Sequence, residues 1–370
     1  MRIVTASSLG EIIGIIDRCA ANVPRPNGAG ANWTAPLWFR GEESGTYDLL
    51  PSLYRNVPPS TLNPASTYED LHLREDYRLQ AFRAKAGHQI TTSPALPLEW
   101  QEIMQHHSVK TRLLDWSESA IISLIFALEN FLPANNSHAA NIKLRKMIPA
   151  LWVLQPQGLN GRIFDIITTP EPGARHLRYP FIESAMRSIA GSNTACISAA
   201  IGDELRRGRQ IYFDPEPGLP SSALINLPAI ESTRQAYAAR LLEALTRYEF
   251  NPFHYILLRI YADGTPIDIN DPLKILPPLA TVHQYHSSRI QAQRGVFLAV
   301  PHYRLDSGSE ALYKAGIDLR TLNRQPANCG LLTKILIDRP ADIAHKLRSI
   351  GEKRSTLFPE LGTYAEEIEP

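Results

Sequence analysis

The feature that most constrains the fold is the apolar run SESAIISLIFALENF, which covers residues 117–131. It is apolar on nearly every side, and Pro133 just beyond it favours a helix end. A helix of this composition belongs in the interior of a domain. Asp115 is a suitable N-cap, and Glu118 three residues later could complete a capping box. We therefore predict a short strand at 111–114, a cap at Asp115 and a buried helix over 117–131.

Polar and aromatic side chains crowd the predicted start of this helix, namely His106, His107, Arg112, Asp115 and Trp116. Charged groups beside a buried helix need partners, and free N–H groups at a helix N-terminus attract anions. The segment could therefore be an anion site. Alternatively, Arg112 and Asp115 could form a structural ion pair that fixes the start of the helix.

The composition is that of a globular protein, with 44% hydrophobic and 20% charged residues in 370. The net charge of +1 gives no strong signal for nucleic acid or for an anionic membrane. Three scattered cysteines indicate neither a disulfide framework nor a thiolate zinc site. The N-terminal residues lack the pattern of a signal peptide, and no apolar run reaches membrane-spanning length. We therefore expect a cytoplasmic protein with no membrane partner.

The order of predicted elements favours an α+β fold with a mixed sheet core and helical elaborations. The predicted strands lie at 1–5, 36–41, 150–155, 254–261, 295–300 and 334–337. The predicted helices lie at about 8–20, 68–87, 98–107, 230–249 and 340–350. We expect residues 1–35 to pack as a strand and helix on one domain at 36–370. The proline-rich stretch around 156–228 has no clear pattern, and we interpret it as an elaborated region.

Several catalytic motifs are absent, including the dinucleotide fingerprint, the P-loop, the GxSxG elbow and the HExxH helix. A metal site could draw on five histidines, which are His106, His107, His283, His286 and His302. Histidines spaced in this way are more often surface or packing residues, so we predict no metal site. Three carboxylates near a predicted strand end could serve a metal-dependent nuclease: Asp263, Asp268 and Asp271. They have no basic partner at a recognisable spacing.

Three segments carry a stronger pattern: WFRG at 38–41, QHHSVKTRLLDW at 105–116 and RIQAQRGVF at 289–297. Together with STLFPEL at 355–361, they resemble the FRG domain family, named for its Phe-Arg-Gly triplet. The resemblance runs from about residue 36 to the C-terminus and is weakest in the middle. The family usually has Gln where this chain has Glu42, and His-Tyr-Gly where this chain has His106-His107-Ser108.

The order of these segments is similar to the layout of ADP-ribosyltransferases of the arginine–serine–glutamate type. That similarity implies an ADP-ribosyltransferase-like fold, NAD as substrate and a macromolecular acceptor. By this analogy Arg40 holds the phosphates or ribose of NAD, and Gly41 leaves room for the ligand. The analogy implies catalytic roles for Asp115, Arg289 and Gln293. The other implied nucleotide-binding residues are Glu42, His106, Thr111, Arg112, Trp116, Ser117 and Gln291.

Gln291 and Gln293 occupy the positions where such enzymes have a glutamate-x-glutamate pair. A neutral glutamine can bond a ribose hydroxyl, but it cannot stabilise an oxocarbenium-like centre by charge. Either another carboxylate takes this role, from Asp115, Glu42 and Glu43, or the protein binds a nucleotide without turnover.

The same residues also have purely structural interpretations. Arg40 could pair with Asp115 or Glu43 in a buried salt bridge. Trp38 and Trp116 could pack in the core rather than stack on a ligand.

Three functions therefore stay open. The first is an ADP-ribosyltransferase-like or NAD-cleaving enzyme, an activity consistent with microbial defence or a toxin. The second is a non-catalytic ligand-sensing or protein-interaction domain, and the third is a metal-dependent nuclease. The relative positions of Arg40, Asp115, Arg289 and Gln293 distinguish a shared site from unrelated contacts.

Overall fold

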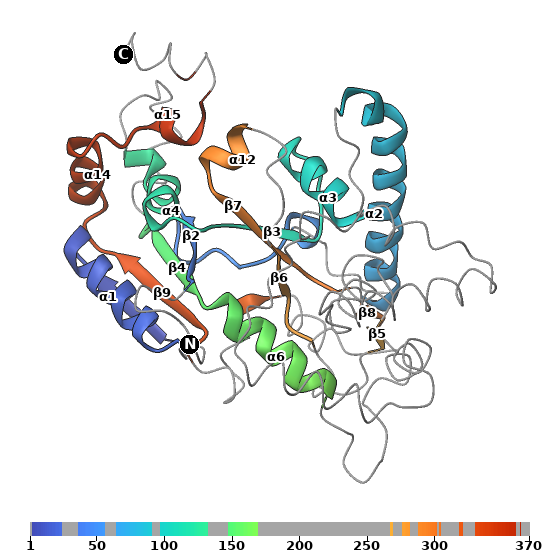
Figure 1. Ribbon diagram of the computed structural model, residues 1–370, viewed down its shortest axis with the longest axis horizontal. Helices are drawn as coiled ribbons and strands as arrows, with labels where there is room; N and C mark the ends of the chain where they lie inside the picture. Colours follow the sequence, from blue (N-terminus) through green and yellow to red (C-terminus); the bar gives the residue numbers. More distant parts are fainter. Residues whose placement is uncertain are drawn as a thin grey trace, which may run out of the picture.

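A seven-stranded mixed sheet forms the centre of the protein in a computed structural model (Figure 1). The structure describes residues 2–23, 36–55, 64–90, 97–131, 147–168, 267–268, 276–281, 288–301, 303–304, 318–320, 330–359 and 363. The strand order is β1-β9-β4-β2-β3-β7-β6, and only β1 and β9 run parallel in this sheet. The prediction of an α+β fold is confirmed.

The strands of the central sheet are β1 (Arg2–Ala6), β2 (Trp38–Glu42), β3 (Leu113–Ser117), β4 (Ala150–Leu154), β6 (Leu279–Thr281), β7 (Gly295–Ala299) and β9 (Leu332–Ile337). A separate parallel pair joins β5 (Ile267–Asp268) to β8 (Tyr303–Arg304). The described α-helices are α1 (Leu9–Ala21), α2 (Pro64–Ala86), α3 (Pro97–His106), α4 (Ala120–Ala127), α6 (Pro156–Thr168), α12 (Ser288–Ala292), α14 (Pro340–Ser349) and α15 (Arg354–Leu357). Three short 3₁₀ helices are η1 (Ser52–Tyr54), η2 (Gly87–Gln89) and η3 (Glu129–Phe131).

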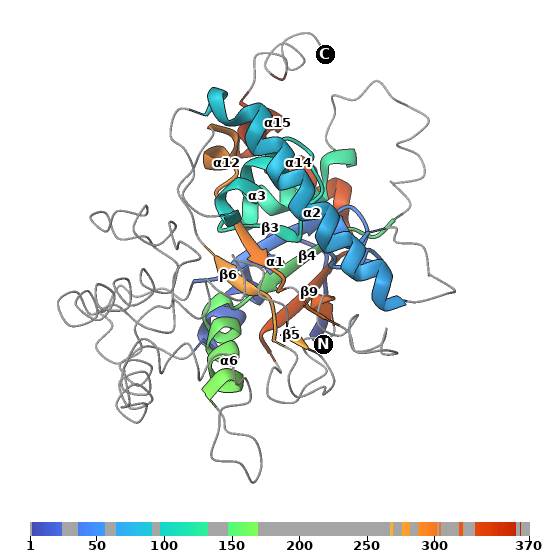
Figure 2. The same cartoon turned by 90° about the vertical axis from the view of Figure 1, so that its right-hand side faces the viewer.

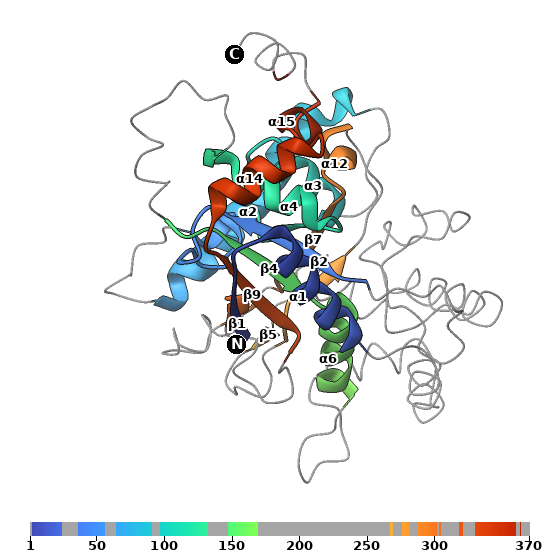
Figure 3. The ribbon, with the colours of Figure 1, turned by 90° about the vertical axis from the view of Figure 1, so that its left-hand side faces the viewer.

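The two faces of the sheet have separate apolar cores because side chains alternate along each strand. On one face Phe39 and Val153 pack with α1, α4 and α14, which lie together in Figure 3. On the other face Trp38, Leu114 and Trp116 pack in a cluster that includes Leu159 of α6. Helices α2 and α3 pack on each other beside the sheet, as Figure 2 shows from the opposite side.

The structure corrects the predicted start of the apolar helix. Strand β3 extends to Ser117, so Asp115 lies at a strand centre opposite Phe297 and caps no helix. The N-cap of α4 is Ser119, whose hydroxyl accepts a bond from the N–H of Ile122 at 3.4 Å. Leu114 and Trp116 explain the difference, because both alternate into the core while the ladder with β7 continues to Ser117.

Most other predicted elements are confirmed near their expected ends. Strands β2, β4, β7 and β9 and helices α1, α2, α3 and α14 overlap the predicted ranges. Helix α6 was not predicted, because Pro156 and two glycines weaken its pattern. The predicted strand at 254–261, the predicted helix at 230–249 and most of the elaborated region at 156–228 lie outside the described residues. No helix in the described part of the chain could span a membrane.

Candidate functional site

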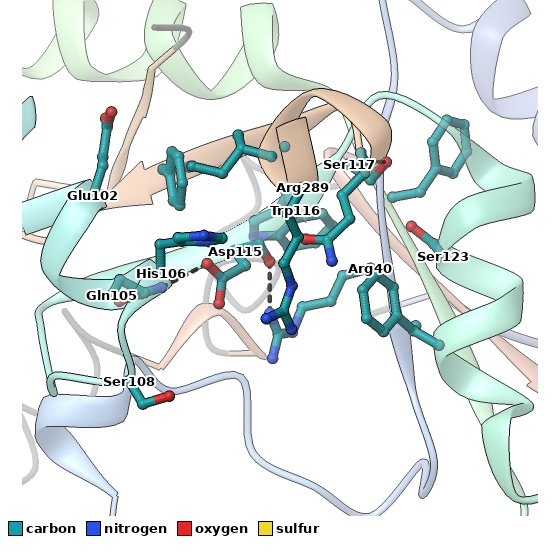
Figure 4. A pocket seen from close by; sticks show the side chains of 17 residues that line it. Arg40, Glu102, Gln105, His106, Ser108, Asp115, Trp116, Ser117, Ser123 and Arg289 are labelled. Carbon is teal, nitrogen blue, oxygen red and sulfur yellow. Dashed lines mark hydrogen bonds between the residues drawn. The ribbon is translucent and has the colours of Figure 1, made fainter. Parts of the chain in front are cut away.

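A cavity of about 320 Å³ lies where β2, β3, α3, α4 and α12 come together (Figure 4). The residues that line it and were predicted as site residues are Arg40, Gly41, His106, Asp115, Trp116, Ser117, Arg289 and Gln293. These residues come from three segments that are far apart in the sequence. The structure therefore brings the arginine of the Phe-Arg-Gly triplet, the Leu-Leu-Asp-Trp strand and the third motif to one hollow.

Arg40 lies at a local opening of the sheet. Strands β2 and β3 pair only where Phe39 faces Ser117. Beyond that point Arg40 Nη1 donates to the backbone carbonyl of Asp115 at 2.6 Å, and Nε donates to Glu42 Oε1 at 2.7 Å. The Arg40 side chain therefore pairs with Glu42, and not with Asp115 or Glu43, the two carboxylates of the alternative structural interpretation. These two bonds hold the guanidinium at the wall of the cavity.

Asp115 presents a fixed carboxylate to the same cavity. Its Oδ1 accepts a bond from Gln105 Nε2 at 2.7 Å, which Figure 4 shows as a dashed line. The hydroxyl of Thr111 donates to Gln105 Oε1, which orients the amide so that its nitrogen faces Asp115. Among the described residues, Asp115 Oδ2 has no hydrogen-bond partner. The site therefore offers one positioned oxygen that can bind a ligand.

Arg112 lies outside the cavity, because its side chain is only 1% exposed and pairs with Glu75 of α2. The Arg112 N–H donates to Glu75 Oε1 at 2.8 Å, and its Nε lies 3.9 Å from Glu75 Oε2. The structural interpretation of Arg112 is therefore correct, but its partner is Glu75 rather than Asp115.

Three other predicted ligand contacts also do not line the cavity. Thr111 is fully buried and orients Gln105, Glu42 holds Arg40, and the Gln291 side chain is exposed to solvent.

Gly41 packs against a helix instead of leaving room for a ligand. A Cβ at Gly41 would lie 1.8 Å from the carbonyl oxygen of Ser123 and 2.8 Å from the Ala127 nitrogen. The missing side chain is therefore needed for the close contact between β2 and α4. The two tryptophans are likewise core residues, with Trp38 1% and Trp116 3% exposed.

Helix α12 and the residue after it form one wall of the cavity, and α12 packs against the C-terminal segment. The guanidinium carbon of Arg289 lies 4.5 Å from the ring centroid of Phe358. Gln293 Nε2 donates to the carbonyl of Leu357 at 3.2 Å, and the Gln293 carbonyl accepts from the Ser117 hydroxyl at 2.7 Å. The Gln293 amide thus joins α12 to the STLFPEL segment, which the sequence had grouped with the site motifs.

The charged neighbourhood extends to Arg55, which the sequence analysis missed. Partial burial lowers the pKa of Arg55, and so does the positive charge of Arg40, while Glu42 and Asp115 raise it. Arg55 follows η1 in a proline-broken segment without a motif, so no sequence signal marks it. Gln105 and Ser108 were also missed, although both belong to the QHHS segment.

Glu43, the residue directly after β2, has a carboxyl pKa above its ordinary value. Burial raises the pKa of Glu43, a hydrogen bond with Asn130 lowers it, and the charges of Glu129 and Glu42 raise it. Glu43 does not line the cavity.

Possible metal ligands do not gather within the described residues, which contain no group of three or more His, Cys, Asp or Glu side chains suited to a metal ion. His283, His286 and His302 lie outside the described residues, as do Asp263 and Asp271.

Comparison with protein families gives one match, to the model of the FRG domain, over residues 35–136. No curated protein matches the chain, and neither does any solved structure. The matched segment includes Arg40, Gln105 and Asp115 but ends well before α12. It is therefore shorter than the resemblance predicted from the sequence, which continued to the C-terminus. Residues 35–136, which supply the β2, α3 and β3 walls of the cavity, are an FRG domain.

Proposed function

We propose that the cavity binds a nucleotide and that the protein is an ADP-ribosyltransferase-like or NAD-cleaving enzyme. One observation carries the proposal: a guanidinium and a carboxylate, from Arg40 and Asp115, share one cavity with Arg289 and Gln293. In a microbe, cleavage of NAD would suit a role in defence or as a toxin.

The proposed chemistry assigns separate roles to the two charged groups of the FRG domain. Arg40 is fixed by Glu42 and by the Asp115 carbonyl, so it can bind phosphate or ribose oxygens with little reorganisation. As the N-glycosidic bond of NAD breaks, its electron pair leaves with nicotinamide and positive charge develops on the ribose. The Asp115 carboxylate stabilises that charge in a partly enclosed site. Water or an acceptor group then attacks the ribose carbon.

Asp115 fits the role of the missing glutamate better than the other two carboxylates considered. Glu42 is paired with Arg40, and neither Glu42 nor Glu43 lines the cavity. The Asp115 carboxylate is oriented by Gln105 and keeps Oδ2 available. Gln293, at the expected glutamate position, is neutral and bonds the Leu357 carbonyl.

The test is incubation of the full chain with isotope-labelled NAD, alone and with cell lysate. We expect nicotinamide release or label transfer by the wild type and a loss of about 100-fold or more in Asp115→Asn. Asp17→Asn on the exposed side of α1 is the matched control and should keep full activity. The proposal is rejected if the wild type shows neither release, nor transfer, nor binding of NAD or ADP-ribose.

A non-catalytic nucleotide sensor is the second candidate, and the contact of Gln293 with the C-terminal segment favours it. If that glutamine serves only to hold Leu357, the cavity has lost the usual catalytic group and retains the binding groups. This candidate predicts that the wild type binds ADP-ribose without turning over NAD. It also predicts that Arg40→Ala abolishes the binding measured by isothermal titration calorimetry.

A further inference from the structure

We infer that residues 354–358, here called the C-terminal latch, position Arg289 to bind the phosphates of the nucleotide, with Phe358 as the positioning residue. None of these five residues lines the cavity, so the latch acts on a ligand through the side chains that it holds. The inference rests on the proposed nucleotide site and deepens it, because it gives a role in binding to a segment outside the FRG domain.

The path of the latch is fixed before and within α15. Gly351 adopts a left-handed φ of +95°, which allows the tight turn after α14, and the Glu352 N–H donates to the Leu347 carbonyl at 3.0 Å. Leu357 is 1% exposed and packs in the core that α1, α4 and α14 form on one face of the sheet. Helix α15 therefore lies against both α4 and α12 (Figure 3).

The latch contacts three residues that line the cavity, which are Phe126, Arg289 and Gln293. The rings of Phe358 and Phe126 meet edge to face, with 6.0 Å between their centroids. The guanidinium carbon of Arg289 lies 4.5 Å from the centroid of the same Phe358 ring. Gln293 Nε2 donates to the Leu357 carbonyl at 3.2 Å. The Phe358 ring thus connects the α4 wall of the cavity to the α12 wall.

The ring contact restrains Arg289 without a hydrogen bond. A guanidinium is attracted to the face of an aromatic ring by the ring quadrupole, and the attraction is stronger where water is excluded. The Phe358 side chain has no polar atom, so the contact uses no N–H donor of Arg289 and neutralises no charge. An arginine that is restrained before the ligand arrives loses less rotamer entropy on binding.

The two arginines of the cavity lining are therefore held in different ways. Arg40 belongs to the FRG domain and is held by hydrogen bonds to Glu42 and to the Asp115 carbonyl. Arg289 belongs to α12 and is held by a ring near the end of the chain. The FRG domain thus supplies one guanidinium, and the second depends on the latch.

The experiment measures the affinity of ADP-ribose for the full chain by isothermal titration calorimetry. Phe358→Leu keeps an apolar side chain at the core but removes the aromatic face. We expect it to weaken binding about fivefold or more, because the cation–π restraint on Arg289 is lost. Phe358→Tyr keeps the ring and should bind ADP-ribose as the wild type does.

A double-mutant cycle distinguishes positioning of Arg289 from general support of the fold. Because Phe358 acts through Arg289, Phe358→Leu should weaken binding no further when it is added to Arg289→Gln. Phe131→Leu is the matched control, since Phe131 packs on the same core and does not line the cavity. This control should keep the wild-type affinity.

Thermal unfolding of each variant identifies any loss of the fold. Phe358→Met, which fills much of the same volume with a flexible chain, takes the place of Phe358→Leu if that variant does not unfold cooperatively. The inference is overturned if the wild type does not bind ADP-ribose or if the folded Phe358 variant binds it as tightly as the wild type. It is also overturned if the variant weakens binding by the same factor in the Arg289→Gln background.

The latch and the proposed enzyme activity can fail separately. NAD cleavage by the wild type, with ADP-ribose affinity unchanged in Phe358→Leu, would reject the latch and leave the activity standing. Affinity that is lost in Phe358→Leu only when Arg289 is present, without nicotinamide release by the wild type, would support the latch and reject the activity.

Discussion

Gly41 shows how one residue of the family triplet can serve packing rather than binding. Its α-carbon lies so close to α4 that an added Cβ would meet backbone atoms of Ser123 and Ala127. Backbone atoms cannot move aside as a flexible side chain can, so β2 and α4 would have to separate. We expect Gly41→Ala to lower the free energy of unfolding by at least about 2 kcal/mol, measured by urea denaturation.

Gly10→Ala is the matched control, since nothing lies within 4 Å of the added Cβ. Gly10 is inside α1, where alanine is favoured over glycine by roughly 0.5–1 kcal/mol, so this variant should be slightly more stable. Equal stability of the two variants would contradict the packing role of Gly41.

Glu43 should make stability depend on pH. Burial raises the pKa of Glu43 above its ordinary value of 4.5, so the folded protein binds this proton more tightly than the unfolded chain. The resulting penalty is present above the raised pKa and is relieved as pH falls toward 4.5. We therefore expect Glu43→Gln to be more stable than the wild type at pH 7, with a smaller difference near pH 4.5.

Urea denaturation of both proteins at several pH values measures this difference. A gap that stays constant from pH 7 to pH 4.5 would show that Glu43 does not titrate differently in the folded state.

Individual site residues could be predicted from the sequence where they belong to a contiguous motif. Arg40 and Asp115 stand in conspicuous segments, and both line the cavity. Arg112 stands in the same segment but is buried against Glu75 of α2, a tertiary contact that the motif does not show. The position of Arg55 depends on tertiary hydrogen bonds between η1 and Thr111, which no local pattern encodes.

At the scale of elements, the buried pair Arg112–Glu75 joins the residue before β3 to α2. Both side chains are almost fully buried, with exposures of 1% and 0%. Removal of one partner of a buried ion pair costs about 3–5 kcal/mol. We expect Glu75→Ala to reduce the unfolding free energy by that amount in urea denaturation.

Glu75→Gln supplies the comparison, because it keeps an oxygen that can accept from the Arg112 N–H while removing the charge. Its loss should be smaller than that of Glu75→Ala. A Glu75→Ala variant with less than about 1 kcal/mol of destabilisation would exclude a stabilising role for the pair.

The existence of most elements could be predicted, but not the change from β3 to α4. The apolar run was expected to be helical from residue 117, whereas the strand continues to Ser117 and the helix starts at Ala120. Pairing with β7 decides this boundary, and β7 is far away in the sequence. A tertiary ladder therefore overrides the local capping signal of Asp115.

At the scale of the whole molecule, the N-terminal strand and helix belong to the same sheet and core as the FRG domain. Strand β1 pairs with β9 over its full length, and Ile12, Ile15 and Cys19 of α1 lie in the core with Phe39 and Val153. Removal of residues 1–22 would expose both the edge of β9 and this apolar surface. We expect the shortened chain to aggregate, as measured by size-exclusion chromatography.

The full chain under the same conditions is the control. A shortened chain that stays monodisperse and unfolds cooperatively in urea would show that β1 and α1 are dispensable for the core.

Because β2 and β3 pair at one position only, a ligand that binds Arg40 can change the stability of the sheet at this point. Next to this pair, one hydrogen bond between the two strands is made by the Arg40 side chain, which donates to the Asp115 carbonyl. A side chain can rotate to a different partner, whereas the peptide groups of a strand cannot. The Asp115 N–H lies on the same side of β3 as the Asp115 carbonyl, because both backbone groups of one residue in an extended strand point the same way. A nucleotide that holds Arg40 in place would slow hydrogen exchange at the Asp115 amide, and one that draws the guanidinium away would speed it. Exchange at this amide thus reports whether ligand binding tightens or loosens the middle of the sheet.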